Sequence, residues 1–194
     1  MNLEKIRWSN GFEQWNLVRF GTPMDGSCLF HAIVNGFFIP YHKEEIRGKK
    51  LSRREIIRKM RDELADKLDE IDPENGKKTY YQTINGGNTQ EFAKSVQEFT
   101  IENMKRVLKS NEFIGYGYIE LIGRCINVDI YILEEKRQDI YKSDENWTGG
   151  RPSVIVYYHD FGHYELVALE HEDGTYTTFF SPDHSLIQFL KSRK

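Results

Sequence analysis

The chain has 194 residues, and at about 150 residues per domain this predicts one compact domain with a short appendage. Hydrophobic residues make up 39% and aromatic residues 13%, which excludes a disordered chain and predicts a substantial core. The 27 Lys and Arg residues against 30 Asp and Glu residues give a net charge of −3, which excludes the basic excess typical of nucleic-acid-binding domains. The basic residues from Arg47 to Arg61 alternate with acidic ones, so we expect them on a solvated helix face.

The sequence indicates an intracellular protein with free thiols. No stretch approaches the roughly 18 apolar residues that span a bilayer, and the first ten residues lack the apolar core of a signal peptide. We therefore expect a soluble, cytoplasmic protein with no membrane partner. The two cysteines, Cys28 and Cys125, are too few for a disulfide framework and form no C-x-x-C pair. We expect both as free thiols, and neither a metal nor another cofactor.

Helices are predicted in the first part of the chain. Residues 1–20 mix polar and aromatic residues and predict a short helix or a packed lead-in. In GTPMDGSCLFHAIVNGFF a Gly-Pro turn gives way to apolar residues at helical spacing, which predicts a buried helix starting near the cysteine. Residues 52–71 predict an amphipathic helix with a capping box of Ser52 and Glu55, and another helix is predicted from Thr89.

Strands are predicted toward the end of the chain. YIELIGRC predicts a short helix, and the β-branched run INVDIYIL after it predicts a strand. VIVYYHD, HYELVALE and TYTTFF predict three more strands, the last two joined by the turn Asp173-Gly174. Ser181 as an N-cap with Pro182 at the first helical position predicts a terminal helix. Helices that precede strands favour α+β layers over a doubly wound fold.

Cys28 is the first candidate for chemistry. It lies in the first turn of the predicted helix, where free backbone N–H groups and the positive end of the helix dipole favour the reactive thiolate. The preceding turn, Asp25-Gly26-Ser27, can direct N–H groups toward the sulfur, as an oxyanion requires. The alternative is a small buried residue without chemistry, because free cysteine is among the most buried residue types.

His163 is the second candidate. It follows a Phe-Gly turn at the start of a predicted strand, where its ring can face a groove. Glu165 projects from the same strand face and can accept a hydrogen bond from the far ring nitrogen. The alternative is a surface histidine beside an ordinary charge. Together with Cys28, this pair follows the pattern of a cysteine hydrolase whose site lies between a helix and a sheet.

Other titratable residues are assigned to packing or to the surface. His159 and His163 are four positions apart, but in a strand-turn-strand segment without further ligands, so no metal site is expected. His31 lies one helical turn after Cys28, and we expect it beside the site or facing solvent rather than acting as the base. The apolar surroundings of Cys125 predict a raised thiol pKa and a packing role.

Three segments resemble the ovarian tumour (OTU) family of cysteine proteases, in the family's order, over roughly residues 21–169. DGSCLFHAI is similar to the nucleophile motif, in which Asp-Gly-x-Cys-Leu-Phe precedes a small residue. YGYIELIGRCINVDIYIL resembles the middle segment, a Gly followed by Glu-Leu and then an Ile/Val-rich strand. VIVYYHDFGHYELV is similar to the closing segment, an apolar strand followed by His-Tyr.

The resemblance implies an α+β, papain-like OTU fold with helices packed on a small, mostly antiparallel sheet. It implies a thiol-dependent deubiquitinase that removes ubiquitin or a ubiquitin-like modifier through a thioester acyl-enzyme. By position, Cys28 is the nucleophile, His163 is the general base, and the N–H groups of Asp25 and Cys28 are part of the oxyanion hole. The family usually has Asp or Asn where this chain has Glu165, which leaves Asp25 as a second candidate for the third catalytic residue.

The resemblance also sets the expected organisation. We expect a lead-in at residues 1–20, an OTU-like catalytic domain at 21–169, and an extension of a hairpin strand and a helix at 170–194. We expect a monomer whose partners are ubiquitin or a ubiquitin-like modifier and its conjugates, with no nucleic acid. The alternative is a catalytically impaired OTU-like module that binds ubiquitin, for which Glu165 would be the first sign. Such a domain is compatible with a viral effector in the host cytoplasm, and equally with a cellular or bacterial protein.

Overall fold

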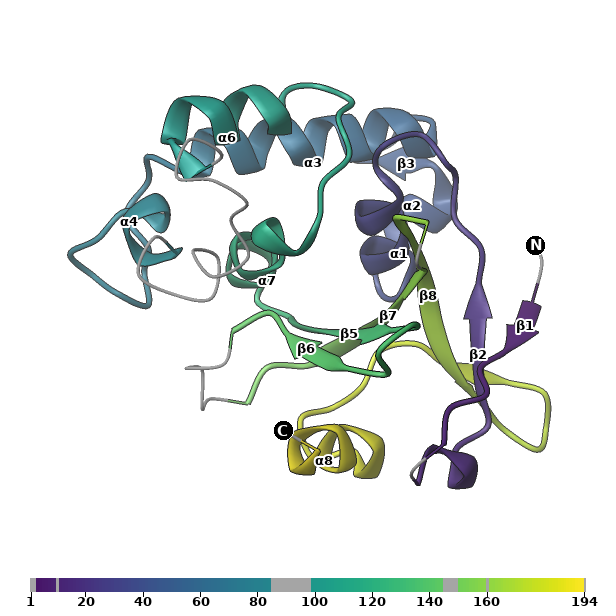
Figure 1. The fold of residues 1–194 in the computed structure, drawn as a ribbon. Coiled ribbons are helices and arrows are strands. Elements are labelled where there is room, and N and C mark those ends of the chain that lie inside the picture. The colour runs from purple at the N-terminus through teal and green to yellow at the C-terminus, as the bar shows by residue number, and fades with distance from the viewer. Residues whose placement is uncertain (1–2, 10, 85–98, 145–149, 160, 194) are drawn as a thin grey trace.

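The computed structural model describes residues 3–9, 11–84, 99–144, 150–159 and 161–193. Figure 1 shows a central sheet with α1, α3, α6 and α7 on one side and α8 on the other. The predicted start of a helix at Thr89 lies outside the described residues. The segment after it forms α6.

The helices follow from local sequence signals. α3 begins with the predicted capping box: the Ser52 hydroxyl accepts from the Glu55 N–H at 3.3 Å, and the Glu55 carboxylate accepts from the Ser52 N–H at 2.8 Å. Residue 67 ends this helix, four residues before the predicted end. The helices are α1 (Cys28–Asn35), α2 (Ile39–Lys43), α3 (Arg53–Lys67), α4 (Tyr80–Ile84), α6 (Ile101–Leu108), α7 (Ile119–Ile126) and α8 (Ser185–Ser192), with 3₁₀ turns at Phe12–Gln14 and Tyr116–Tyr118.

Seven strands of the described residues form one mixed sheet in the order β1-β2-β8-β7-β5-β6, with β9 also paired to β8. Every pair is antiparallel except β5 with β7, which confirms the prediction of a mostly antiparallel sheet. β3 and β4 form a separate hairpin. The strands are β1 (Leu3–Lys5), β2 (Leu17–Phe20), β3 (Glu45–Ile46), β4 (Lys49–Lys50), β5 (Asp129–Glu134), β6 (Ile140–Lys142), β7 (Ser153–His159), β8 (His163–Glu170) and β9 (Tyr176–Thr177).

Both faces of the sheet are buried. Along β5, Ile130 and Ile132 belong to the core beneath α1, α3 and α7, whereas Tyr131 and Leu133 belong to a second core beneath α8. Successive residues of a strand point to opposite faces, so a strand covered on both sides must be apolar throughout. This explains why INVDIYIL is almost continuously apolar.

The terminal helix begins later than predicted. The Ser181-Pro182 signal is not used as an N-cap, because Phe180 exchanges two backbone hydrogen bonds with Ser153 at 2.8 and 2.9 Å and the chain then makes a turn. α8 starts at residue 185, and its N-cap is His184, whose Nδ1 accepts from the Leu186 N–H at 3.2 Å. The predicted strand TYTTFF is likewise reduced to the two residues of β9.

Three segments meet at one end of the sheet. β2 runs antiparallel to β8 with Phe20 opposite Leu166, so the end of β2 lies near the start of β8. The loop after β2 leads into α1, which packs across β8 and β7. The start of α1 and the start of β8 are thereby brought together. Within the described ranges, no helix combines the length and the apolar character needed to cross a membrane.

Candidate active site

The loop before α1 has a fixed backbone. The Asp25 carboxylate accepts a hydrogen bond from the Ser27 N–H at 3.1 Å. Gly26 has a φ of +80°, a conformation that side-chain-bearing residues rarely adopt, and a Cβ there would lie 2.1 Å from the carbonyl oxygen of Asn111. Only glycine fits this position. Residues 25–28, where the sequence predicts an oxyanion hole, are called the oxyanion loop below.

Cys28 is the first residue of α1 and is 3% exposed. Burial raises the pKa of its thiol, and this outweighs the backbone N–H groups of Tyr164 and Leu29, which bond to the sulfur and lower that pKa. The thiolate expected from the helix dipole is therefore not the resting form. Loss of solvation destabilises the thiolate more than the N–H groups at the start of the helix stabilise it. The bond from Tyr164 places the thiol against the residue that follows His163.

His163 opens β8, and burial lowers the pKa of its imidazole, so the ring is neutral at pH 7. Its Nε2 lies 3.3 Å from Oγ1 of Thr22, and the Thr22 hydroxyl donates to the carbonyl of Tyr164 at 2.5 Å. With its proton used in that bond, the hydroxyl can only accept from Nε2–H. Nδ1 is then the unprotonated nitrogen and is available as a base.

Glu165 bonds to other partners than the one predicted. Its Oε2 lies 3.0 Å from Nε2 of His159 and 3.2 Å from Nη1 of Arg19. Burial opposes ionisation of this carboxyl, but these two neighbours outweigh it and hold its pKa below the usual value. The rings of His159 and His163 are stacked with centroids 6.2 Å apart. Orientation of His163 by Glu165 stays a prediction.

Asp25 also has partners away from His163. Its Oδ2 lies 3.2 Å from Nε2 of His31 and 3.6 Å from Nε of Arg54. His31 is 1% exposed, and its Nδ1 is 2.7 Å from the hydroxyl of Tyr41. The solvent-facing alternative for His31 is therefore wrong, and this histidine lies beside the oxyanion loop, in contact with Asp25.

A surface cavity of about 360 Å³ opens beside His163. Thr22 and Glu165 line it, and Met24, which is 84% exposed, stands at its border. Cys125 lies elsewhere, in α7, and burial raises the pKa of its thiol to about 12, as its apolar surroundings predict.

Sequence reasoning missed two residues that this geometry includes. Thr22 carries no motif, and only its contact with His163, 141 positions away, shows its place. Arg61 was expected on a solvated helix face, but it is 0% exposed. It faces inward because it lies four and seven residues from Ile57 and Leu68 on the buried stripe of α3, a spacing that could have identified it.

No protein-family model matches the sequence, and no curated protein matches it. Among solved structures, an OTU domain in complex with ubiquitin aligns with 97% of this chain and 87% of its own, at 16% identity and a TM-score of 0.60. The Hazara virus OTU bound to ubiquitin aligns with 87% of this chain and 89% of its own, at 12% identity and a TM-score of 0.46. An OTU deubiquitinase from Wolbachia pipientis wMel aligns with 92% of this chain and 97% of its own, at 11% identity and a TM-score of 0.45.

The first of these alignments spans nearly the whole chain, and its TM-score of 0.60 identifies the fold. An identity of 16% transfers the arrangement of the backbone and not the activity. The resemblance suggested by the three sequence motifs is thus confirmed for the architecture. This chain has the α+β fold of an OTU domain.

Proposed function

We propose that the protein is a thiol-dependent deubiquitinase, which cleaves ubiquitin or a ubiquitin-like modifier from its conjugates. One observation carries the proposal: α1, which begins with Cys28, packs across β8, which begins with His163. A thiol beside a neutral imidazole is the arrangement that cysteine hydrolases need. The OTU fold and the ubiquitin bound to the similar domain supply the substrate class.

The proposed reaction uses the resting protonation states of both groups. Nδ1 of His163 takes the proton of Cys28 as the sulfur attacks the carbonyl carbon of the modifier's C-terminal glycine. The N–H groups of Asp25 and Cys28 hold the oxyanion that forms. The lysine amine leaves with the proton from His163, and water then hydrolyses the thioester. No cofactor takes part.

The third role in this reaction is to hold the imidazole. We propose Thr22 for it, supported by the 3.3 Å contact between its Oγ1 and Nε2 of His163. Glu165 acts by charge, since its carboxylate raises the pKa of His163 against the effect of burial. Asp25 serves the oxyanion loop through its bond to the Ser27 N–H.

The proposal extends to partners and location. We propose that the chain works as a monomer on ubiquitin conjugates in the cytoplasm. The two free thiols, Cys28 and Cys125, fit a reducing compartment.

The decisive experiment is labelling with ubiquitin that carries an electrophile at its C-terminus. We expect one covalent adduct per chain, located on Cys28 by peptide mapping, at the same rate in the Cys125→Ser variant. Cys28→Ala should form none. An adduct on Cys125 that spares Cys28 would contradict the assignment of the nucleophile.

A second candidate function is a ubiquitin-binding module without catalysis. It is favoured by the burial of Cys28, which raises the pKa of the thiol and leaves it un-ionised at rest. The two functions differ in one result. A pure binding module would bind ubiquitin in calorimetry and yet remain unlabelled by the electrophilic probe.

A further inference from the structure

Arg61 is a fully buried cation, and all three nitrogens of its guanidinium donate hydrogen bonds. From α3, its Nε donates to the carbonyl of Leu108 at 3.0 Å, and its Nη2 donates to the carbonyls of Val107 and Glu112 at 2.7 and 3.0 Å. These carbonyls belong to the end of α6 and to the turn after it. Arg61 therefore fixes that turn against α3.

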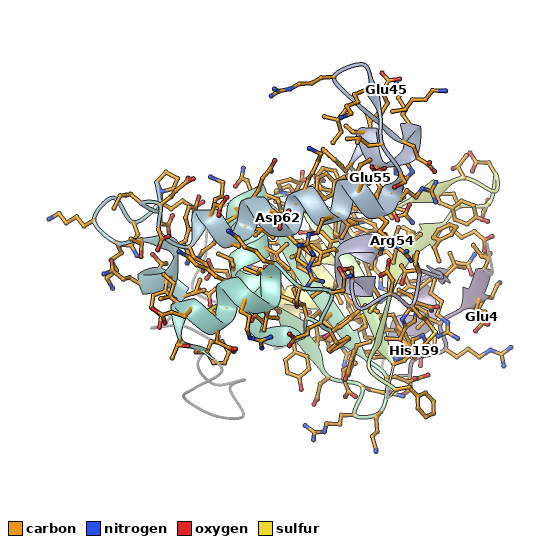
Figure 2. All side chains as sticks on the ribbon, turned by 90° about the horizontal axis from the view of Figure 1, so that it is seen from above. Glu4, Glu45, Arg54, Glu55, Asp62 and His159 are labelled. Carbon is orange, nitrogen blue, oxygen red and sulfur yellow. The ribbon has the colours of Figure 1, made fainter. Side chains whose placement is uncertain are left out.

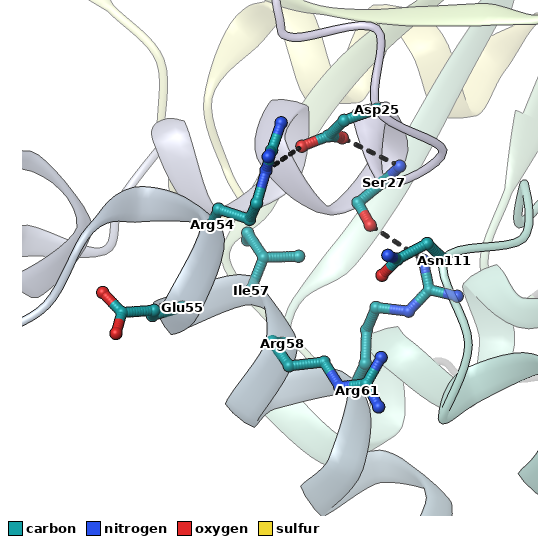
Figure 3. Close-up of a pocket in the computed structure, with 8 residues that line it drawn as sticks. All are labelled: Asp25, Ser27, Arg54, Glu55, Ile57, Arg58, Arg61 and Asn111. Carbon is teal, nitrogen blue, oxygen red and sulfur yellow. Dashed lines mark hydrogen bonds and ion pairs between the residues drawn. The ribbon is translucent and has the colours of Figure 1, made fainter.

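The remaining nitrogen of Arg61 reaches the oxyanion loop. Nη1 donates to the hydroxyl of Ser27 at 2.8 Å and lies 3.4 Å from the carbonyl oxygen of Gly26. Figure 3 shows Ser27, Asn111 and Arg61 close together among the residues that line a pocket. The pocket has a volume of about 480 Å³. The carbonyl of Asn111 also packs on Gly26, so the turn after α6 contacts the oxyanion loop directly. Arg61 donates hydrogen bonds to both this turn and the loop.

The peptide between Gly26 and Ser27 is held at both ends. Its carbonyl faces Nη1 of Arg61, and its N–H donates to the carboxylate of Asp25 at 3.1 Å. Rotation of this peptide would lose both contacts. Of the two N–H groups that the proposed function assigns to the oxyanion, that of Cys28 belongs to the next peptide, and that of Asp25 lies two peptides earlier in the chain.

We propose that Arg61 is a positioning residue that keeps the oxyanion loop assembled before substrate binds. The proposal rests on the proposed function, because it concerns the same oxyanion site. Arg61 acts through the loop and does not touch the substrate.

Stability alone does not explain this arginine. Its five hydrogen bonds go to uncharged oxygens, four carbonyls and one hydroxyl. Burying a cation among neutral acceptors loses more solvation free energy than burying an apolar side chain of similar size. An apolar neighbour is already present, because Cζ of Arg61 lies 5.6 Å from the centroid of the Phe30 ring. What a planar guanidinium offers, and an apolar side chain does not, is a fixed angle between α6 and the loop.

Two variants test the proposal. Arg61→Lys keeps the positive charge but removes the planar guanidinium, whose three nitrogens donate to α6 and to the oxyanion loop. Ser27→Ala removes one acceptor from the loop and leaves the helix start unchanged, because the Ser27 side chain makes no capping hydrogen bond to α1. Arg58→Lys is the matched control, since Arg58 lies on the same helix, is exposed and pairs with Asp62.

Kinetics on ubiquitin with a fluorogenic C-terminal amide separate positioning from a general structural effect. We expect Arg61→Lys to lower kcat about tenfold or more and Ser27→Ala to lower it severalfold, since a small misplacement near the reacting atoms is enough for such losses. KM and the rate of Cys28 alkylation by iodoacetamide, which forms no oxyanion, should stay within about twofold. Arg58→Lys should match the wild type in kcat, in KM and in the rate of Cys28 alkylation.

Each other result overturns the proposal. A folded Arg61→Lys with wild-type kcat would do so, and so would equal losses in alkylation and in cleavage. If Arg61→Lys does not fold, as judged by thermal unfolding, then Ser27→Ala decides, and its wild-type kcat would be the contrary result.

Failure of the proposed function would be seen separately. If the wild type cleaves no ubiquitin substrate, the rate of amide hydrogen exchange in the segment 22–30 tests the positioning role of Arg61 without any measurement of activity. We then expect faster exchange there in Arg61→Lys and Ser27→Ala, and unchanged exchange in β5. Unchanged exchange of the segment 22–30 would overturn the positioning role.

Discussion

Oγ1 of Thr22 lies 3.3 Å from Nε2 of His163, while its hydroxyl hydrogen is used by the carbonyl of Tyr164. One short side chain thus selects the tautomer of the candidate base. The nitrogen that remains unprotonated is Nδ1, which is therefore the one that can accept a proton. The carboxylate that the sequence suggested for this task, Glu165, bonds instead to His159 and Arg19.

Replacement of Thr22 by valine should lower activity. The methyl group keeps the shape but cannot accept from Nε2–H, so the imidazole loses its orienting bond. We expect kcat to fall by about tenfold to a hundredfold, the scale of disturbed acid–base catalysis, with little change in KM. Thr22→Ser keeps the hydroxyl and should retain most of the activity. Wild-type kcat in Thr22→Val would assign the orienting role to Glu165.

The pH dependence of kcat/KM should be a broad plateau with two limbs. Burial moves the pKa of His163 below 6.5 and that of Cys28 above 9.0, so the resting pair is neutral between these limits. The acidic limb should lie below pH 6.5, where protonated His163 cannot accept the thiol proton. The basic limb should lie above pH 9.0, where the second proton of the pair is lost. A fall in activity near neutral pH would instead indicate a resting thiolate–imidazolium pair.

The contact between His159 and Glu165 should make stability depend on pH. Its hydrogen bond to Glu165 raises the pKa of His159 above 6.5, so this group stabilises the fold below pH 6.5 and loses that effect as pH rises through the folded value. Glu165 has a lowered pKa, so its contribution is present above pH 4.5 and is lost as pH falls through the folded value.

The variant His159→Gln tests this window. Urea unfolding near pH 5.5 should show a loss of roughly 1.5 kcal/mol, the lower end of the range for a hydrogen bond to a charged group. Above pH 8 the loss should be smaller. His171→Gln, a change of an exposed histidine outside this cluster, is the control. An equal loss at both pH values would contradict the ionic contribution.

Two glycines with nearly the same φ allow a matched test of the oxyanion loop. Gly26 has φ +80° and Gly174 has φ +78°, but a Cβ on Gly26 would meet the carbonyl oxygen of Asn111 at 2.1 Å, whereas a Cβ on Gly174 would meet nothing within 4 Å. We expect Gly174→Ala to cost about 1 kcal/mol, from the backbone conformation alone. Gly26→Ala should cost clearly more and abolish cleavage. Equal shifts in Tm would show that the loop can move away from Asn111.

Elements with complete local signals could be predicted from the sequence. The capping box of α3 and the apolar runs of β5, β7 and β8 depend on neighbours within a few residues. Ser181 also satisfied a local rule, and that prediction was wrong, because the bridge between Phe180 and Ser153 keeps the chain at the sheet beyond that point. A contact between distant segments outweighed a favourable cap.

The same distinction applies to the site. Cys28 and His163 could be proposed because each stands in a recognisable segment. Thr22 could not, since a threonine in a loop has many ordinary explanations. The spacing of Arg61 on the buried stripe of α3 indicates that it faces inward, but not what it contacts. The contacts of both residues follow only from how α3, α6 and β8 pack around the oxyanion loop.

The pairing of β2 with β8 has a consequence for the time at which the site forms during synthesis. Thr22 and His163 are 141 positions apart, so the ribosome needs on the order of ten seconds to make the second residue after the first. Throughout that interval the nascent chain carries Cys28 without the imidazole of His163 and without strand β8. The two candidate site residues therefore come together only late in synthesis, when β8 takes its place between β2 and β7.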